Sequence, residues 1–148
     1  MPEDAQVFKY ERPEFETGKR AVRLCKNGRM TAAIQVVKTG GETNLHAHPH
    51  MDGFWMVLSG RARFYNDVET VVAELGPFEG IFIPRNYKYW FESASEEPLE
   101  LVQVEASDKD FNELRGESRR VNYTPFTRED PADLVTDGVT AVVPGAGS

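Results

Sequence analysis

The chain has 148 residues, the length of one domain with a single hydrophobic core. Its 17 Lys and Arg residues against 24 Asp and Glu give a net charge of −7, which argues against nucleic acid and against an anionic membrane as partners. No apolar run approaches the roughly 18–20 residues of a membrane span. The acidic N-terminal sequence lacks the features of a secretory signal, and Cys25 is the only cysteine, so we expect a cytoplasmic protein.

Short runs rich in β-branched and aromatic residues, separated by Gly, Asn, Asp and Pro, predict about nine strands between residues 20 and 106. The dipeptide Asn27-Gly28 is typical of a type I′ hairpin turn and should join strands over 21–26 and 29–37. Beyond the histidines, further strands are expected over 54–60, 62–65, 68–75, 80–84, 87–93 and 99–106. This density predicts an all-β sandwich or barrel with almost no helix.

The two ends of the chain differ from this strand-rich barrel, which we place at 19–106. Residues 1–18 are charged with few apolar positions, and we expect an N-terminal arm that lies over the barrel or is partly disordered. The C-terminal extension, 107–148, is expected to form one short helix, with Ser107 or Asp108 as its N-cap, followed by loop or partly disordered chain.

The strand-forming run over 54–58, FWMVL, is apolar on both of its faces. A strand with one face in water should alternate polar and apolar residues, so something covers its outer side. A second sheet, a terminal arm or an identical subunit would do so, and we favour a homodimer. Complete burial of these side chains in the chain's own core explains the pattern equally well.

All three histidines lie within residues 46–50. His46 and His48 are two positions apart, so on an extended strand both imidazoles point to the same face and can share a metal ion. Imidazole suits several transition metals, so the pair does not name the ion. His50 follows Pro49 in a turn-like sequence and is a weaker candidate ligand.

A spaced motif surrounds this pair. Gly40 is followed by five residues, then by His46-Ala47-His48, then by four residues, Gly53, six residues and Gly60.

A second motif, FEGIFIPRNYKY, lies over 78–89. With the first motif it resembles the two motifs of the cupin superfamily, small double-stranded β-helix barrels, over residues 30 to 105. In this resemblance Asn86 occupies the position of a turn glycine, which Asn can replace because it tolerates positive φ.

This sequence differs from the cupin motifs at two metal-ligand positions. Metal-binding cupins use three His and one Glu, and this chain has Gly53 at the Glu position and Tyr89 at the last His position. Asp52 could supply a carboxylate only if a bulge turned it inward, because adjacent strand residues face opposite sides. Tyr89, with a phenol pKa near 10, is better suited to donate a proton or a hydrogen bond than to ligate a divalent ion.

Strand parity predicts which other side chains face the cavity. If position 53 faces inward, so does Trp55, and if Tyr89 does, so do Tyr87 and Phe91. Gln35, in the middle of an apolar strand, is a candidate hydrogen-bonding group. We therefore predict ligand contacts from Trp55, Tyr87, Phe91 and Gln35, metal ligation by His46, His48 and Asp52 with His50 weaker, and catalytic roles for Tyr89 and His48.

Three functions follow from these residues and the resemblance. The favoured one is a small-molecule enzyme that uses the His-x-His pair to hold a divalent Fe, Zn, Mn or Ni ion and acts on a small oxygenated or aromatic substrate, as a dioxygenase, isomerase or lyase. The second is a metal-free isomerase or epimerase in which a histidine and Tyr89 act as base and acid. The third is a barrel that binds a small ligand without catalysis.

Overall fold

The computed structural model describes residues 3–39 and 44–123, together with the backbone of residues 135–136. The strands are β1 (Lys19–Lys26), β2 (Met30–Val37), β3 (His46–Ala47), β4 (Met51–Ser59), β5 (Ala62–Tyr65), β6 (Val71–Leu75), β7 (Gly80–Ile83), β8 (Trp90–Ser93), β9 (Leu99–Ser107), β10 (Val121–Asn122) and β11 (Val135–Thr136). Two single-turn helices, η1 (Phe111–Glu113) and η2 (Gly116–Ser118), lie between β9 and β10. The expected all-β class is confirmed, and neither helix is long and apolar enough to cross a membrane.

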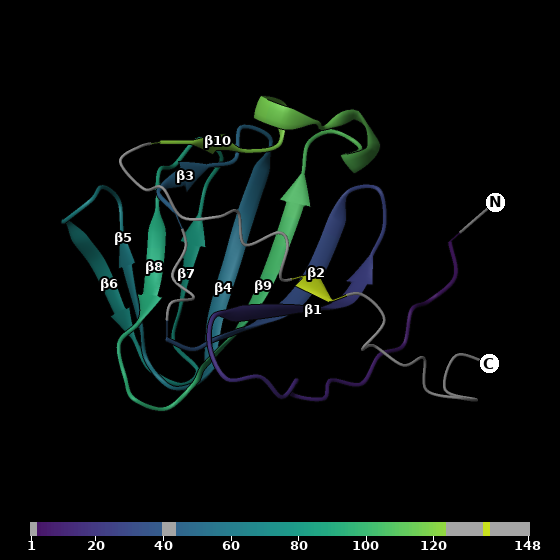
Figure 1. The fold of residues 1–148 in the computed structure, drawn as a ribbon. Coiled ribbons are helices and arrows are strands. Elements are labelled where there is room, and N and C mark those ends of the chain that lie inside the picture. Colours follow the sequence, from purple (N-terminus) through teal and green to yellow (C-terminus); the bar gives the residue numbers. More distant parts are fainter. Residues whose placement is uncertain (1–2, 40–43, 124–134, 137–148) are drawn as a thin grey trace.

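The strands form three sheets, as Figure 1 shows. The largest has the order β11-β1-β2-β9-β4-β7, the second β6-β5-β8, and β3 pairs with β10 in a small third sheet. The hairpin expected at Asn27-Gly28 is present, because β1 and β2 pair antiparallel on either side of it. Its turn is not of type I′, since neither Asn27 nor Gly28 has the positive φ that this turn requires. Asn86 has a φ of 67°, the left-handed conformation expected of a residue at the turn-glycine position.

The main core lies between the two larger sheets. Trp55 and Val57 of β4 and Leu101 of β9 meet Phe64 of β5 and Phe91 of β8 there. These positions alternate along each strand, so one face of the large sheet is apolar and faces the smaller sheet. The parity expected for β4 is confirmed: Trp55 and Val57 are buried, whereas Phe54 is 47% exposed.

The N-terminal arm covers part of the opposite face of the large sheet. Tyr10 and Phe15 pack against a second apolar cluster that includes Ile34 of β2. The Tyr10 hydroxyl donates a hydrogen bond to the buried Glu100 carboxylate over 2.6 Å, and Arg12 forms an ion pair with the same carboxylate. On the outer side of the FWMVL strand, Leu58 therefore packs against the same apolar cluster as the arm, whereas Phe54 is exposed.

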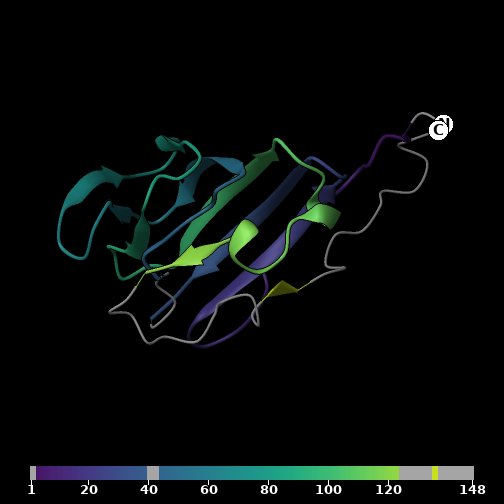
Figure 2. The ribbon, with the colours of Figure 1, turned by 90° about the horizontal axis from the view of Figure 1, so that it is seen from above.

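The single helix expected after residue 107 is not observed. In its place are η1, capped by the Asp110 side chain, and η2, which starts at Gly116 with a φ of 56°. Phe111 and Leu114 pack on Met51, which fixes the chain at two positions and turns it back across the sheets. Seen from above in Figure 2, the η2–β10 segment lies across the end of the space between the two larger sheets. The remaining part of the expected extension, residues 124–134 and 137–148, lies outside the described residues.

Candidate active site

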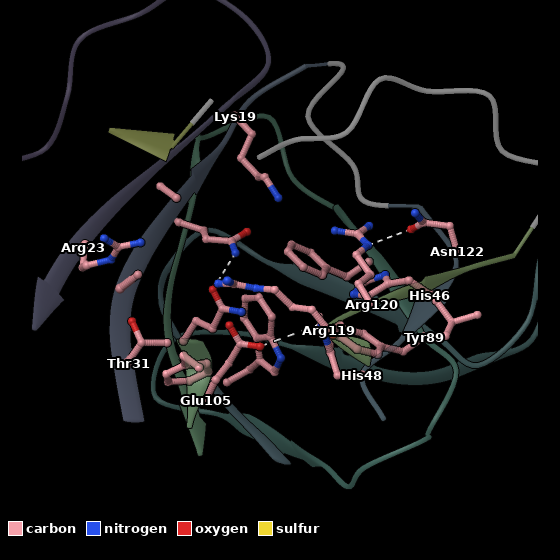
Figure 3. Close-up of a pocket in the computed structure, with 18 of the residues that line it drawn as sticks. Lys19, Arg23, Thr31, His46, His48, Tyr89, Glu105, Arg119, Arg120 and Asn122 are labelled. Carbon is pink, nitrogen blue, oxygen red and sulfur yellow. Dashed lines mark hydrogen bonds and ion pairs between the residues drawn. The ribbon is translucent and has the colours of Figure 1, made fainter. Parts of the chain in front are cut away.

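A cavity of about 890 Å³ opens between the large sheet and the η2–β10 segment (Figure 3). Its walls come from the inner faces of β1, β2, β4 and β9, from β3 and β8, and from the chain after β9. The lining residues are Lys19, Ala21, Arg23, Lys26, Thr31, Ala33, Gln35, His46, His48, Trp55, Tyr89, Phe91, Gln103, Glu105, Phe111, Gly116, Glu117, Arg119, Arg120, Val121 and Asn122.

The backbone holds His46, His48 and Tyr89 at one end of this cavity. His46 pairs with Tyr89 through two backbone hydrogen bonds, of 3.0 and 2.9 Å, and with Asn122 of β10 on its other side. The His46 ring centroid lies 5.0 Å from that of His48 and 4.4 Å from that of Tyr89. The pairing of His46 with His48 that their spacing suggested, and the approach of Tyr89 to both, are therefore present.

Backbone carbonyls select the tautomer of both imidazoles. The Nδ1 of His46 lies 2.5 Å from the carbonyl oxygen of Asn44, and the Nδ1 of His48 lies 2.9 Å from that of Arg119. Because a carbonyl oxygen only accepts, each neutral ring carries its proton on Nδ1 and keeps a lone pair on Nε2. Both histidines thus offer an unprotonated nitrogen as a base or as a ligand.

Burial and nearby charges shift the pKa values of this cluster in opposite directions. Burial lowers the pKa of His46 well below 6.5, and the positive charge of Arg120 lowers it further. Burial raises the pKa of Tyr89 far above its usual value, and the Glu105 carboxylate adds to the rise. The Trp55 indole N–H opposes that rise, although its geometry falls short of a hydrogen bond. Both groups are therefore neutral at pH 7, so His46 carries no charge and Tyr89 keeps its proton.

The lowered pKa of His46 predicts how stability changes with pH. In the unfolded protein His46 takes up a proton near pH 6.5, whereas in the folded protein it does so only at lower pH. The full stability is therefore present above pH 6.5 and is lost as the pH falls below that value. We expect His46 to contribute up to about 1.4 kcal/mol of lost stability per pH unit in that range. Urea unfolding of the wild type and of His46→Gln between pH 7.5 and 5.5 measures this as a difference in slope. A slope in His46→Gln equal to that of the wild type would contradict the prediction.

Sequence reasoning missed Glu105. It lies on β9 directly opposite Gly53 of β4, and its Oε2 is 3.9 Å from Nε2 of His48. A carboxylate from the neighbouring strand thus lies beside Gly53, the position at which the cupin motif has a glutamate. Only the register of β4 with β9 shows this, and sequence spacing does not contain that register.

Sequence reasoning also missed the positive charges of the cavity. Five cationic residues line it against two acidic ones, Glu105 and Glu117, among the described residues of a chain whose net charge is −7. Three come from β1 and two from the segment before β10, as Figure 3 shows for four of them. The cations are Lys19, Arg23, Lys26, Arg119 and Arg120.

Other expected site residues lie elsewhere. Asp52 does not line the cavity: its carboxylate accepts a hydrogen bond from the Arg85 backbone over 2.9 Å, and the bulge in β4 falls after Val57, too far away to turn it inward. His50 points to Asp108, with 3.1 Å between Nδ1 and Oδ1. Tyr87 packs against the same core cluster as Tyr89 and Phe91 but does not line the cavity. Trp55, Phe91 and Gln35 do line the cavity.

The described residues do not form a complete metal site. No group of three or more His, Cys, Asp or Glu side chains within residues 3–39 and 44–123 is placed to hold a metal ion. His46 and His48 supply two nitrogens, position 53 supplies no side chain, and the guanidinium of Arg120 is close enough to His46 to repel a cation.

The comparisons with known proteins agree with the fold. A family model described as a cupin domain matches residues 33–105. No curated protein matches the chain. Among solved structures, the chain is similar to an uncharacterised protein with a double-stranded β-helix domain from Klebsiella pneumoniae, at 21% identity and a TM-score of 0.59, covering 68% of this chain and 81% of that one.

Two further structures share this architecture. An RmlC-like cupin family protein from Methanocaldococcus jannaschii has 14% identity and a TM-score of 0.57, covering 70% of this chain and 91% of that one. The DMSP lyase DddQ from Ruegeria pomeroyi has 19% identity and a TM-score of 0.52, covering 69% of this chain and 47% of that one. Identities this low show the shared fold alone. With the family model, they confirm the double-stranded β-helix, and residues 33–105 form a cupin domain.

Proposed function

We propose that this cupin is a small-molecule enzyme that moves a proton between carbon and His48, with Tyr89 stabilising the oxygen that gains charge. The observation that carries the proposal is the placement of the His48 ring, whose Nδ1 lies 2.9 Å from the Arg119 carbonyl oxygen and whose Nε2 lies 3.9 Å from Oε2 of Glu105 at the cavity. Such a nitrogen can accept a proton, and the nearby carboxylate stabilises the imidazolium that forms.

The proposed step is proton abstraction next to a carbonyl or carboxyl group. The C–H bond breaks, its proton goes to Nε2 of His48, and its electron pair moves to the substrate oxygen. The Tyr89 hydroxyl, held protonated by its raised pKa, donates a hydrogen bond to that oxygen. Return of the proton to another carbon gives an isomerase, and loss of a group from the neighbouring carbon gives a lyase.

Proton exchange in heavy water tests this proposal with a range of compounds that carry an acidic C–H bond. A panel of small ketones, hydroxyketones, keto acids and hydroxy acids is incubated with the protein, and proton NMR follows the loss of C–H signals. We expect exchange above the buffer rate for at least one member. The proposal fails if no compound exchanges, including any ligand that is carried through purification.

Metal dependence, which the family resemblance implies, stays a prediction that the same experiment addresses. Elemental analysis of untagged protein, with exchange assayed before and after chelation, separates the two mechanisms. Exchange that survives chelation supports proton transfer by the side chains alone. Stoichiometric metal together with loss of exchange on chelation would favour the metal-dependent enzyme.

We also propose that the protein is a homodimer that covers its exposed phenylalanines. Phe54 and Phe82 are opposite each other on β4 and β7, are 47% and 62% exposed, and lie at the edge of the large sheet. Phe82→Glu should convert the dimer to a monomer in light scattering after size exclusion. Val71→Glu, at an exposed valine of the other sheet, is the matched control and should remain dimeric. A wild-type monomer at micromolar concentration would contradict the proposal.

A further inference from the structure

The cavity has a charge opposite to that of the whole chain. Its five cations and two carboxylates leave an excess of positive charge around a concave, partly apolar space, while the chain carries −7. A cavity whose walls carry one sign of charge concentrates ions of the other sign. The ligand that fits this field is an anion.

Two of these cations approach the catalytic cluster. Lys19 is only 4% exposed, and its Nζ lies 5.9 Å from the centre of the Phe91 ring, within cation–π range. Figure 3 shows Lys19 directed into the cavity from β1 and Arg120 from the opposite side, beside His46. The charges of both residues lower the pKa of His46, which places their field at the His46 imidazole.

The cavity also contains buried polar atoms that the described residues leave without a hydrogen bond. They are the indole N–H of Trp55, a donor, and the Oε1 of Gln35, an acceptor. The side-chain amide of Gln35 donates to Gln103 over 2.7 Å, so only its oxygen is left. Buried polar atoms are normally paired, so a ligand or an ordered water in the cavity would pair with both.

We propose that the cavity binds a small organic carboxylate, with its negative charge between Lys19 and Arg120 and its carbon skeleton against Phe91 and Trp55. The inference rests on the proposed function in one respect, because the carboxylate is taken to be the substrate of that reaction. A carboxylate held there lies close to the imidazole pair, which suits abstraction of a proton from a neighbouring carbon. The cations would also stabilise the charge that develops on the substrate oxygens.

Calorimetric titration with paired anionic and neutral probes tests the inference. Benzoate is compared with benzamide, and lactate with lactamide, because each amide keeps the shape of the acid and removes its charge. We expect at least one carboxylate to bind about tenfold or more tightly than its amide, the usual effect of a charge-assisted hydrogen bond. Raising the ionic strength should weaken the binding of the carboxylate and leave the affinity for the amide unchanged.

Charge-removing variants identify the residues. Lys19→Met and Arg120→Gln should each weaken the binding of the carboxylate and leave the affinity for the amide unchanged. Arg63→Gln removes a cation that pairs with Glu74 outside the cavity, so it should change neither affinity. Arg120 is only partly buried, so its variant keeps the test valid if the buried Lys19 variant fails to fold. Equal affinity for acids and amides, or no effect of a folded Arg120→Gln, would overturn the inference. So would tight binding of phenyl phosphate with carboxylates no better than their amides.

The binding experiment and the exchange experiment can disprove the carboxylate site and the proposed reaction independently of each other. A clear preference for carboxylates without proton exchange would defeat the proposed reaction and leave the binding site standing. Exchange of neutral ketones without any preference for carboxylates would defeat the inference and leave the reaction standing.

Discussion

Replacing His48 with glutamine is expected to slow proton exchange by a factor of about 10² to 10⁴, the usual contribution of a general base. Glutamine keeps a group that can bond to the Arg119 carbonyl, but it has no nitrogen lone pair with which to accept a proton. The initial rate of signal loss in heavy water, measured with the best compound of the panel, gives the factor. The stability of the variant should change little, because the His48 side chain is partly exposed.

Two further variants make that result specific. Tyr89→Phe removes only the hydroxyl, so we expect slower exchange with little change in the affinity for the compound. His50→Gln is the matched control, since it makes the same substitution two residues away at a histidine that pairs with Asp108 outside the cavity. Exchange that is equally fast in His48→Gln and in the wild type would contradict the assignment of the base.

The parts of the site that depend on local spacing could be predicted from the sequence. His46 and His48 share a face because strand residues alternate, and the same rule places Trp55 in the cavity. The rule does not tell how far the cavity extends: Tyr87 packs against the same core cluster as Tyr89 and Phe91, but it precedes β8 and lies outside the cavity. The same rule explains why Asp52 does not enter the cavity: without a bulge at that point of β4, Asp52 faces the opposite side from Gly53.

The parts that depend on contacts between distant segments could not be predicted. Glu105 reaches His48 only because β9 pairs with β4 in a register that puts it opposite Gly53. Arg119 and Arg120 follow a run with no regular period, so nothing local indicated that this segment crosses the cavity. The chain after β9, expected to be helix and then loop, therefore supplies the carbonyl that sets the tautomer of His48 and a cation beside His46.

Truncating Phe64 to alanine is expected to destabilise the protein by about 3–5 kcal/mol, as for other large side chains removed from a packed core. Phe64 is fully buried, and its ring stacks on Phe91 at 4.9 Å and on Tyr89 at 6.2 Å between centroids. A domain of this size has only about 5–15 kcal/mol of stability, so this loss is a large fraction of it. Urea unfolding followed by circular dichroism measures the change.

Phe8→Ala is the matched control, because it makes the same substitution at a ring of the N-terminal arm that is 42% exposed and should change the free energy of unfolding by about 0.5 kcal/mol or less. The Phe64 variant should also lose proton exchange before it unfolds, since the cavity it leaves lies behind the Tyr89 ring and lets the hydroxyl move. A loss below about 1 kcal/mol would mean that the core re-forms around the gap. In that case the position of Tyr89 would be set by its backbone pairing with His46 and not by the aromatic core.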